Sequence, residues 1–268
     1  MTPAVRAAVA LAVGAVAALV LLALLRRRGP AGTPRWERTN FRGKPVHLGA
    51  GPAIVLAACG AAFVGAPTAR AAAAVAAAGL VAGAAGLYDD LSGDAATKGL
   101  RGHLAELRRG RPTSGALKVP ALGIAGLAAG VIVHGLTLRA VLDGAFVAGA
   151  ANLVNLLDLR PGRAAKVIVV AALTSLGFGA TAAAAPAGAA LALLPADLRE
   201  RVMLGDAGAN GAGAAVAASS LAAIRLPTLL AALGIVAALT LASEWVSFSR
   251  VIDRVPPLRW ADQLGRRP

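Results

Sequence analysis

Paired aspartates carry the first chemical signal in this chain. The stretch GLYDDLSGD, residues 86–94, places Asp89 and Asp90 side by side at the end of a long run of small apolar residues. Adjacent carboxylates repel each other, and burying them without a counter-charge is costly. The pair therefore indicates either a solvated helix end or a site for a cation or a phosphate-bearing ligand.

A second polar motif is NLVNLLD, residues 152–158. Its polar residues Asn152, Asn155 and Asp158 recur at every third position, so they lie along one side of a predicted helix. Three polar side chains on an otherwise apolar helix either line a cavity or hydrogen bond to neighbouring helices.

Two further motifs place charge beside glycine-rich or basic sequence. VMLGDAGANGAG, residues 202–213, puts Asp206 at the start of a predicted helix. Asp206 either caps that helix or holds a divalent cation while backbone N–H groups receive phosphate oxygens. In KGLRGH, residues 98–103, Lys98 and Arg101 lie about one helical turn apart, which suits a diphosphate clamp or simply a solvated basic loop.

The segments that position these motifs are apolar and long. The chain is 57% hydrophobic and 15% charged, and runs of about 20 apolar residues recur along it. Hydrocarbon requires each span to satisfy its own backbone hydrogen bonds, so the fold class is all-α, a polytopic membrane protein with about nine transmembrane helices. The expected spans are residues 3–25, 47–66, 71–88, 117–135, 140–157, 166–181, 183–196, 207–224 and 228–247.

The distribution of lysine and arginine predicts the orientation. With the N-terminus outside, 23 of the 27 basic residues fall on the inner side, so the motifs are expected at the cytoplasmic face of the plasma membrane. The four that face out are Arg6, Arg70, Arg139 and Arg225. The first span runs into three arginines and lacks a cleavage site, so we expect a retained helix rather than a signal peptide.

Two regions are expected, a transmembrane domain over residues 1–247 and a cytoplasmic amphipathic tail over 248–268. In the tail, Trp245, Phe248, Ile252 and Val255 share one face of a predicted helix, which suits a helix lying along the membrane surface. Pro256 is expected to end this helix together with the proline that follows it.

Taken in order, the motifs resemble those of the polyprenyl-phosphate N-acetylhexosamine-1-phosphate transferases (glycosyltransferase family 4), which include the translocase of peptidoglycan synthesis. GLYDDLSG is similar to the family's aspartate pair and KGLRGHL to the stretch that follows it. NLVNLLDLRPG is similar to its Asn-x-x-Asn-x-x-Asp-Gly motif, and VMLGDAGANGAGA to its Gly-Asp-x-Gly-Ser segment. The chain departs from the family at Pro161, which replaces a second aspartate, and in having no histidine after His134.

The resemblance implies a Mg²⁺-dependent enzyme, with Mn²⁺ as a substitute cation, that transfers a sugar 1-phosphate from a UDP-sugar to a polyprenyl phosphate and releases UMP. It implies Asp206 as the metal ligand, and Asp89 and Asp90 as the groups that orient or deprotonate the lipid phosphate. The other implied site residues are Asp158, Asn152 and Asn155 on the nucleotide side and Lys98 and Arg101 at the phosphates. The expected partners are the bilayer, the lipid phosphate and the UDP-sugar; a nucleic acid is not expected, and a homodimer is left open.

Two other functions remain open at this stage. The first is a non-catalytic relative that binds polyprenyl phosphate or acts as a scaffold for envelope-synthesis proteins. The second is a transporter or channel, which the sequence disfavours because Asp143 and Glu244 are the main intramembrane charges.

Overall fold

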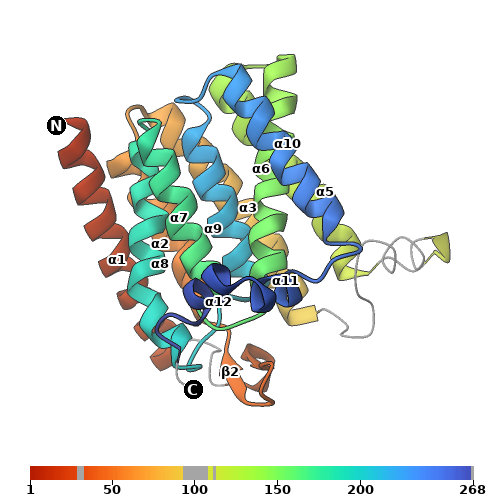
Figure 1. Ribbon diagram of the computed structural model, residues 1–268. Coiled ribbons are helices and arrows are strands. Elements are labelled where there is room, and N and C mark those ends of the chain that lie inside the picture. Colours follow the sequence, from red (N-terminus) through yellow and green to blue (C-terminus); the bar gives the residue numbers. More distant parts are fainter. Residues whose placement is uncertain (29–32, 93–107, 111–112, 267–268) are drawn as a thin grey trace.

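The computed structural model describes residues 1–28, 33–92, 108–110 and 113–266, and the predicted phosphate ligands Lys98 and Arg101 lie outside these ranges. Within the described ranges, nine helices of 15 residues or more run back and forth side by side (Figure 1). They are α1 (Pro3–Arg28), α2 (Ala50–Gly65), α3 (Ala69–Ser92), α5 (Ser114–His134), α6 (Leu138–Leu157), α7 (Arg163–Gly177), α8 (Ala184–Leu198), α9 (Gly205–Ser220) and α10 (Leu226–Ala242).

This arrangement confirms the all-α class, and each predicted span overlaps one of these helices. In the described part of the chain, five helices are long and apolar enough to cross a membrane: Pro3–Arg27, Ala69–Ser92, Ser114–His134, Leu138–Leu157 and Thr181–Leu198. Ala50–Gly65 and Leu226–Ala242 are apolar but shorter. The total of about nine spans stays a prediction.

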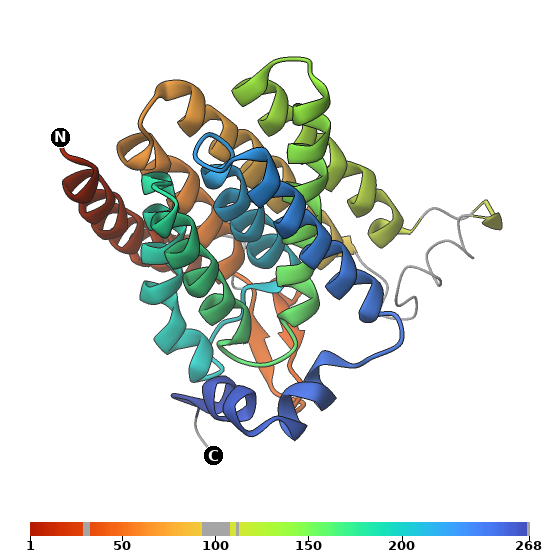
Figure 2. The same ribbon diagram turned by 45° about the horizontal axis from the view of Figure 1, so that its top comes forward.

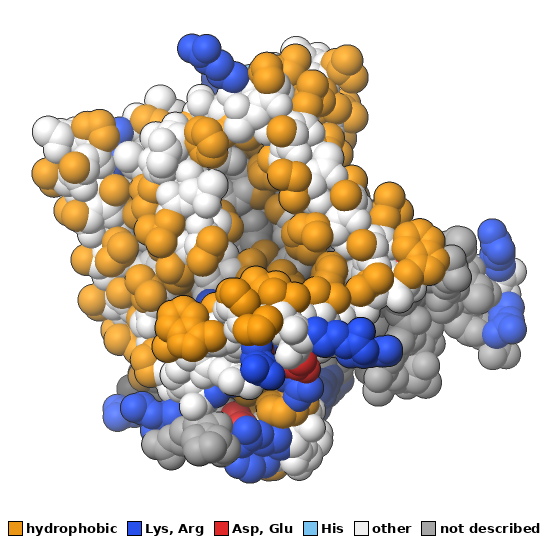
Figure 3. Space-filling view, viewed as in Figure 1, with side chains coloured by type: hydrophobic (Ala, Val, Ile, Leu, Met, Phe, Trp, Pro, Cys, Tyr) orange, Lys and Arg blue, Asp and Glu red, His pale blue; other side chains and the backbone are white. Residues whose placement is uncertain are grey.

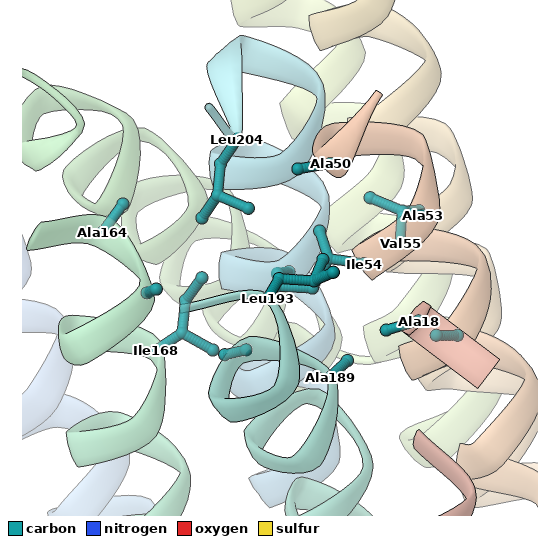
Figure 4. Close-up of a cluster of buried hydrophobic side chains, with 14 of the residues drawn as sticks. Ala18, Ala50, Ala53, Ile54, Val55, Ala164, Ile168, Ala189, Leu193 and Leu204 are labelled. Atoms are coloured by element: carbon teal, nitrogen blue, oxygen red, sulfur yellow. The ribbon is translucent and has the colours of Figure 1, made fainter. Parts of the chain in front are cut away.

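Small residues allow the helices to approach closely. A Cβ atom on Gly126 would overlap the backbone of Gly144, and one on Gly130 would overlap that of Ala140, so glycine permits the contact between α5 and α6. Elsewhere larger side chains such as Ile54, Ile168 and Leu193 fill the core between α2, α7, α8 and α9 (Figure 4).

Charged side chains gather at one end of the helix bundle, and apolar side chains cover its flanks (Figure 3). We call this the charged end; it carries the C-termini of α3 and α6 and the N-termini of α5, α7 and α9. A short antiparallel hairpin, β1 (Glu37–Thr39) and β2 (Pro45–His47), also lies there. The hairpin is held to the segment before α9 by the Met203 N–H, which donates to the His47 carbonyl at 3.0 Å.

The tail forms two short helices rather than the single one predicted. Helix α11 (Phe248–Arg254) stops before Pro256, as expected, but α12 (Pro256–Gln263) begins at that same proline, since proline is well suited to the first position of a helix. Both helices cross the charged end (Figure 2). Trp245 and Val255 lie outside α11, so the predicted apolar face does not form on one helix.

Candidate functional site

The aspartates singled out in the sequence meet at the charged end. Asp89 and Asp90 lie in the last turn of α3, Asp158 directly follows α6, and Asp206 lies in the first turn of α9. The three helices pack against one another through α9. The structure therefore brings together residues that are more than a hundred positions apart in the chain.

Asp90 caps helix α9 from a neighbouring helix. Its two carboxylate oxygens accept hydrogen bonds from the backbone N–H of Asp206, at 3.1 Å, and of Ala207, at 2.9 Å. An acid at a helix N-terminus also interacts favourably with the helix dipole. Asp206 itself makes no capping hydrogen bond in α9, so the proposal that Asp206 serves as the cap is wrong and Asp90 fills that role.

Lys118, near the start of α5, lies at the centre of the site. Its ammonium contacts the carboxylate of Asp89 at 3.0 Å and forms a second ion pair with Asp206. In the amide orientation that satisfies its neighbours, the Asn155 nitrogen donates to Asp206 at 2.8 Å and its oxygen accepts from Lys118 at 3.1 Å. Four helices, α3, α5, α6 and α9, thus contribute one polar group each.

Asp158 is the least satisfied member of the site. One of its carboxylate oxygens is buried and has no hydrogen-bond partner among the described residues. Burial raises the pKa of Asp158 well above its usual range, and the charges of Asp197, Asp206 and Asp90 raise it further. A buried carboxyl oxygen without a donor indicates a position where a ligand group or a proton is received.

A polar cavity of about 380 Å³ adjoins Asp158. Its lining includes Asn40, Phe41 and Val46 from the hairpin, which form one wall, and residues 158–161 and Asp197, which form a second. The guanidinium of Arg160 lies 4.1 Å from the centre of the Phe41 ring, a cation–π contact that links the two walls.

Glu200 anchors the hairpin beside this cavity. It accepts a hydrogen bond from the Asn40 side chain at 2.8 Å and forms an ion pair with Arg42 at 3.3 Å. The Asn40 side chain also accepts from two backbone N–H groups of the hairpin turn, those of Arg42 and Lys44. The position of the hairpin wall therefore depends on Glu200, which lies far from the hairpin in the sequence.

An apolar groove of about 340 Å³ runs along the flank of the bundle, between α6, α7, α9 and α10. Its lining includes Phe146, Val154, Ile168, Phe178 and Val236. The space-filling view is hollowed between α7 and α10 (Figure 3). Val154 in this groove directly precedes Asn155, so the groove and the polar site are adjacent on α6.

One predicted residue lies outside this cluster, and two residues of the site were not predicted. Asn152 is half-buried on α6 and forms no hydrogen bond to this cluster among the described residues. Lys118 and Asp197 were not selected from the sequence as site residues. Lys118 counted only toward orientation, although a lysine inside an apolar segment is itself a sign of function.

The donor set suits a hard divalent cation. Mg²⁺ prefers carboxylate and carbonyl oxygens, needs only one or two protein carboxylates, and takes the rest of its shell from water and substrate phosphates. Asp206, Asp89 and the Asn155 oxygen supply such groups, and Asp158 holds an unpartnered oxygen nearby. Over the described ranges, no group of three or more histidine, cysteine, aspartate or glutamate side chains is already placed to hold a metal.

Comparison with known proteins adds no assignment to this geometry. No protein-family model matches the chain, and none of the curated proteins matches it.

Proposed function

We propose that this chain is a divergent phosphoglycosyl transferase that moves a sugar 1-phosphate from a UDP-sugar to a polyprenyl phosphate. The carrying observation is that Asp89, Asp206, Asn155 and Lys118 converge at the charged end. On α6, Asp158 borders the polar cavity and Val154, the neighbour of Asn155, borders the apolar groove. A lipid phosphate acceptor and a charged sugar donor need this combination of surfaces.

The proposed reaction is a phosphoryl transfer. An oxygen of the polyprenyl phosphate attacks the β-phosphorus of the UDP-sugar, and the bond from that phosphorus to the oxygen bridging the two phosphates breaks. The products are polyprenyl diphosphate sugar and UMP, which leaves with the bridging oxygen. A bound Mg²⁺ would neutralise the charge of the transferring phosphoryl group.

The geometry supports separate roles for the two neighbouring aspartates. Both oxygens of Asp90 accept backbone N–H groups of α9, so Asp90 positions Asp206. Asp89 interacts with the side chains of Lys118, Ser114 and Asp206 rather than with the backbone of α9, and we assign Asp89 to orient or deprotonate the lipid phosphate. Asp206 would hold the cation.

The two cavities support the division of substrates. The polar cavity beside Asp158 offers carboxylate and amide groups that can receive the hydroxyls of a sugar nucleotide. The apolar groove is lined almost wholly by hydrocarbon and suits the chain of a lipid acceptor. Helix α6 contributes to both regions, because Val154 lines the groove and Asp158, directly after the helix, lines the polar cavity.

One observation favours a second function. Lys118 neutralises the same carboxylates that a cation would need, which also fits a relative that binds polyprenyl phosphate without catalysis or serves as a scaffold for envelope-synthesis proteins.

The deciding experiment is an assay of UMP release. Purified protein in detergent is incubated with undecaprenyl phosphate, Mg²⁺ and each of a panel of UDP-sugars. Release with one sugar, lost on chelation, supports the transferase. No release with any sugar, together with retained binding of the lipid phosphate in native mass spectrometry, supports the non-catalytic function. A reporter fused after Pro268 tests whether the charged end faces the cytoplasm.

A further inference from the structure

We infer that Lys118 is an internal counter-ion that occupies the cation position of the site and must be displaced when a divalent cation enters. The inference rests on the proposed function only in expecting these oxygens to receive such a cation. It assigns to Lys118 a role in setting cation affinity, which neither the motif pattern nor the net charge of the chain indicates.

The contacts of Lys118 are complete. A lysine ammonium has three N–H donors, and three oxygen acceptors surround this one, from Asp89, Asp206 and Asn155. The acceptors come from α3, α9 and α6, whereas the lysine comes from α5. Its side chain is 13% exposed, so the ammonium is held among these groups rather than in solvent.

The same three oxygens are ligands of the kind that a divalent cation prefers. Mg²⁺ binds carboxylate oxygens at about 2.0–2.1 Å, closer than an ammonium, and two cations cannot share these ligands without strong repulsion. Entry of Mg²⁺ or Mn²⁺ therefore requires the ammonium to leave. The cost of breaking its contacts subtracts from the binding free energy of the cation.

The displaced ammonium can bind a phosphate group of the substrate. The lysine stem is four carbons long and flexible, and an ammonium is a good phosphate ligand. A substrate diphosphate that arrives with the cation supplies the negative charge that Lys118 loses. Cation and diphosphate binding are then coupled, because each makes room or provides charge for the other.

The first test measures Mn²⁺ binding without catalysis. Free Mn²⁺ is followed by electron paramagnetic resonance during titration of the wild type, Lys118→Gln, and the matched control Lys166→Gln, whose lysine donates to the backbone of residues 261–262. Removing the internal cation should tighten Mn²⁺ binding at least about tenfold, or 1.4 kcal/mol. Adding Asp206→Asn to Lys118→Gln should abolish the gain. Binding to Lys118→Gln no tighter than to the wild type overturns the inference.

The second test uses the folded wild type alone and so does not depend on the variant folding. An amine-reactive reagent labels accessible lysines, and mass spectrometry compares Lys118 with Lys166 at increasing Mn²⁺. Labelling of Lys118 should rise severalfold with Mn²⁺ and that of Lys166 should not. Constant labelling of Lys118 at Mn²⁺ concentrations up to saturation or precipitation overturns the inference. Neither result depends on UMP release, so failure of the proposed function remains distinguishable.

Discussion

Two charged clusters lie at opposite ends of the helix pair α5 and α6, and they differ in how their charges are balanced. At the far end, Asp143 is fully buried, with Arg139 Nε 2.9 Å from one oxygen and His134 Nδ1 2.6 Å from the other. Arg139 also donates to the Ile224 carbonyl at 3.0 Å, which ties α6 to the turn before α10. This is one acid enclosed by its partners.

At the charged end, the acids outnumber the basic group that they contact. Lys118 faces two carboxylates, and Asp158, which borders a polar cavity, adds a third acid with an oxygen that has no partner among the described residues. A cluster in which each charged group has a partner of opposite charge stabilises the packing of its helices. A cluster with more acids than bases, beside a cavity, can bind a ligand that supplies the missing positive charge. The comparison predicts that substitutions at the two ends will affect different measurements.

The largest effect is expected from Asp206→Asn. Asparagine keeps the size of the side chain but removes the charge that a hard cation needs, so the rate of UMP release should fall about 10³-fold or more. The thermal unfolding midpoint should stay near that of the wild type, because Asp206 is not the helix cap and Lys118 keeps its ion pair with Asp89. Wild-type turnover in this variant would exclude Asp206 as the metal ligand.

Asp143→Asn tests the other end and should affect stability instead. Removing the carboxylate leaves Arg139 and His134 without their shared buried partner, which should cost about 1–3 kcal/mol of unfolding free energy. Thermal unfolding in detergent measures the loss. The exposed Asp253→Asn serves as a control and should change stability by less than about 0.5 kcal/mol. An unchanged midpoint for Asp143→Asn would show that the far cluster does not hold these helices.

Gly86→Ala should have an intermediate effect on both measurements. A Cβ atom at Gly86 would overlap the backbone carbonyl of Asp206, so α3 and α9 must move apart and the aspartates with them. Such overpacking typically costs about 1–3 kcal/mol. Gly123→Ala on α5 is the matched control, because nothing lies within 4 Å of the added atom. Equal stability and equal UMP release in the two variants would contradict the close contact at Gly86.

The sequence predicted the helices and the site unequally well, for physical reasons. Apolar runs of membrane length determine helices locally, so each expected span overlaps one. The aspartates were found because acids are costly beside such runs. The cap that Asp90 provides was not, because it joins residues 116 positions apart. Lys118 was hidden among the many basic residues that define orientation.

The tail illustrates the same limit. An apolar pattern predicted one surface helix, but the tail forms two, and a buried ion pair holds the second against α7. Arg163, at the start of α7, contacts Asp262 of α12 at 2.7 Å, and its side chain is only 4% exposed. No local pattern in residues 248–268 identifies a partner on α7.

The smallest effect is expected from this contact between α7 and the tail. Burial disfavours the ionised form of Asp262, but hydrogen bonds and charges from Arg163 and Arg266 outweigh it and lower the pKa of Asp262. With the docked pKa below the value of about 3.9 expected for a free aspartate, docking is fully favoured above that pH and is lost as pH falls through the docked pKa. Asp262→Asn should release the tail even at pH 7.

Limited trypsin digestion measures this release, because Arg259 lies within α12 and is exposed. Cleavage there should be several times faster in Asp262→Asn than in the wild type, and unchanged in Asp253→Asn, which alters an exposed acid of α11. UMP release should change little, since the contact lies on α7 rather than among Asp89, Lys118 and Asp206. Faster cleavage accompanied by a large loss of activity would mean that the docked tail helps to form the site.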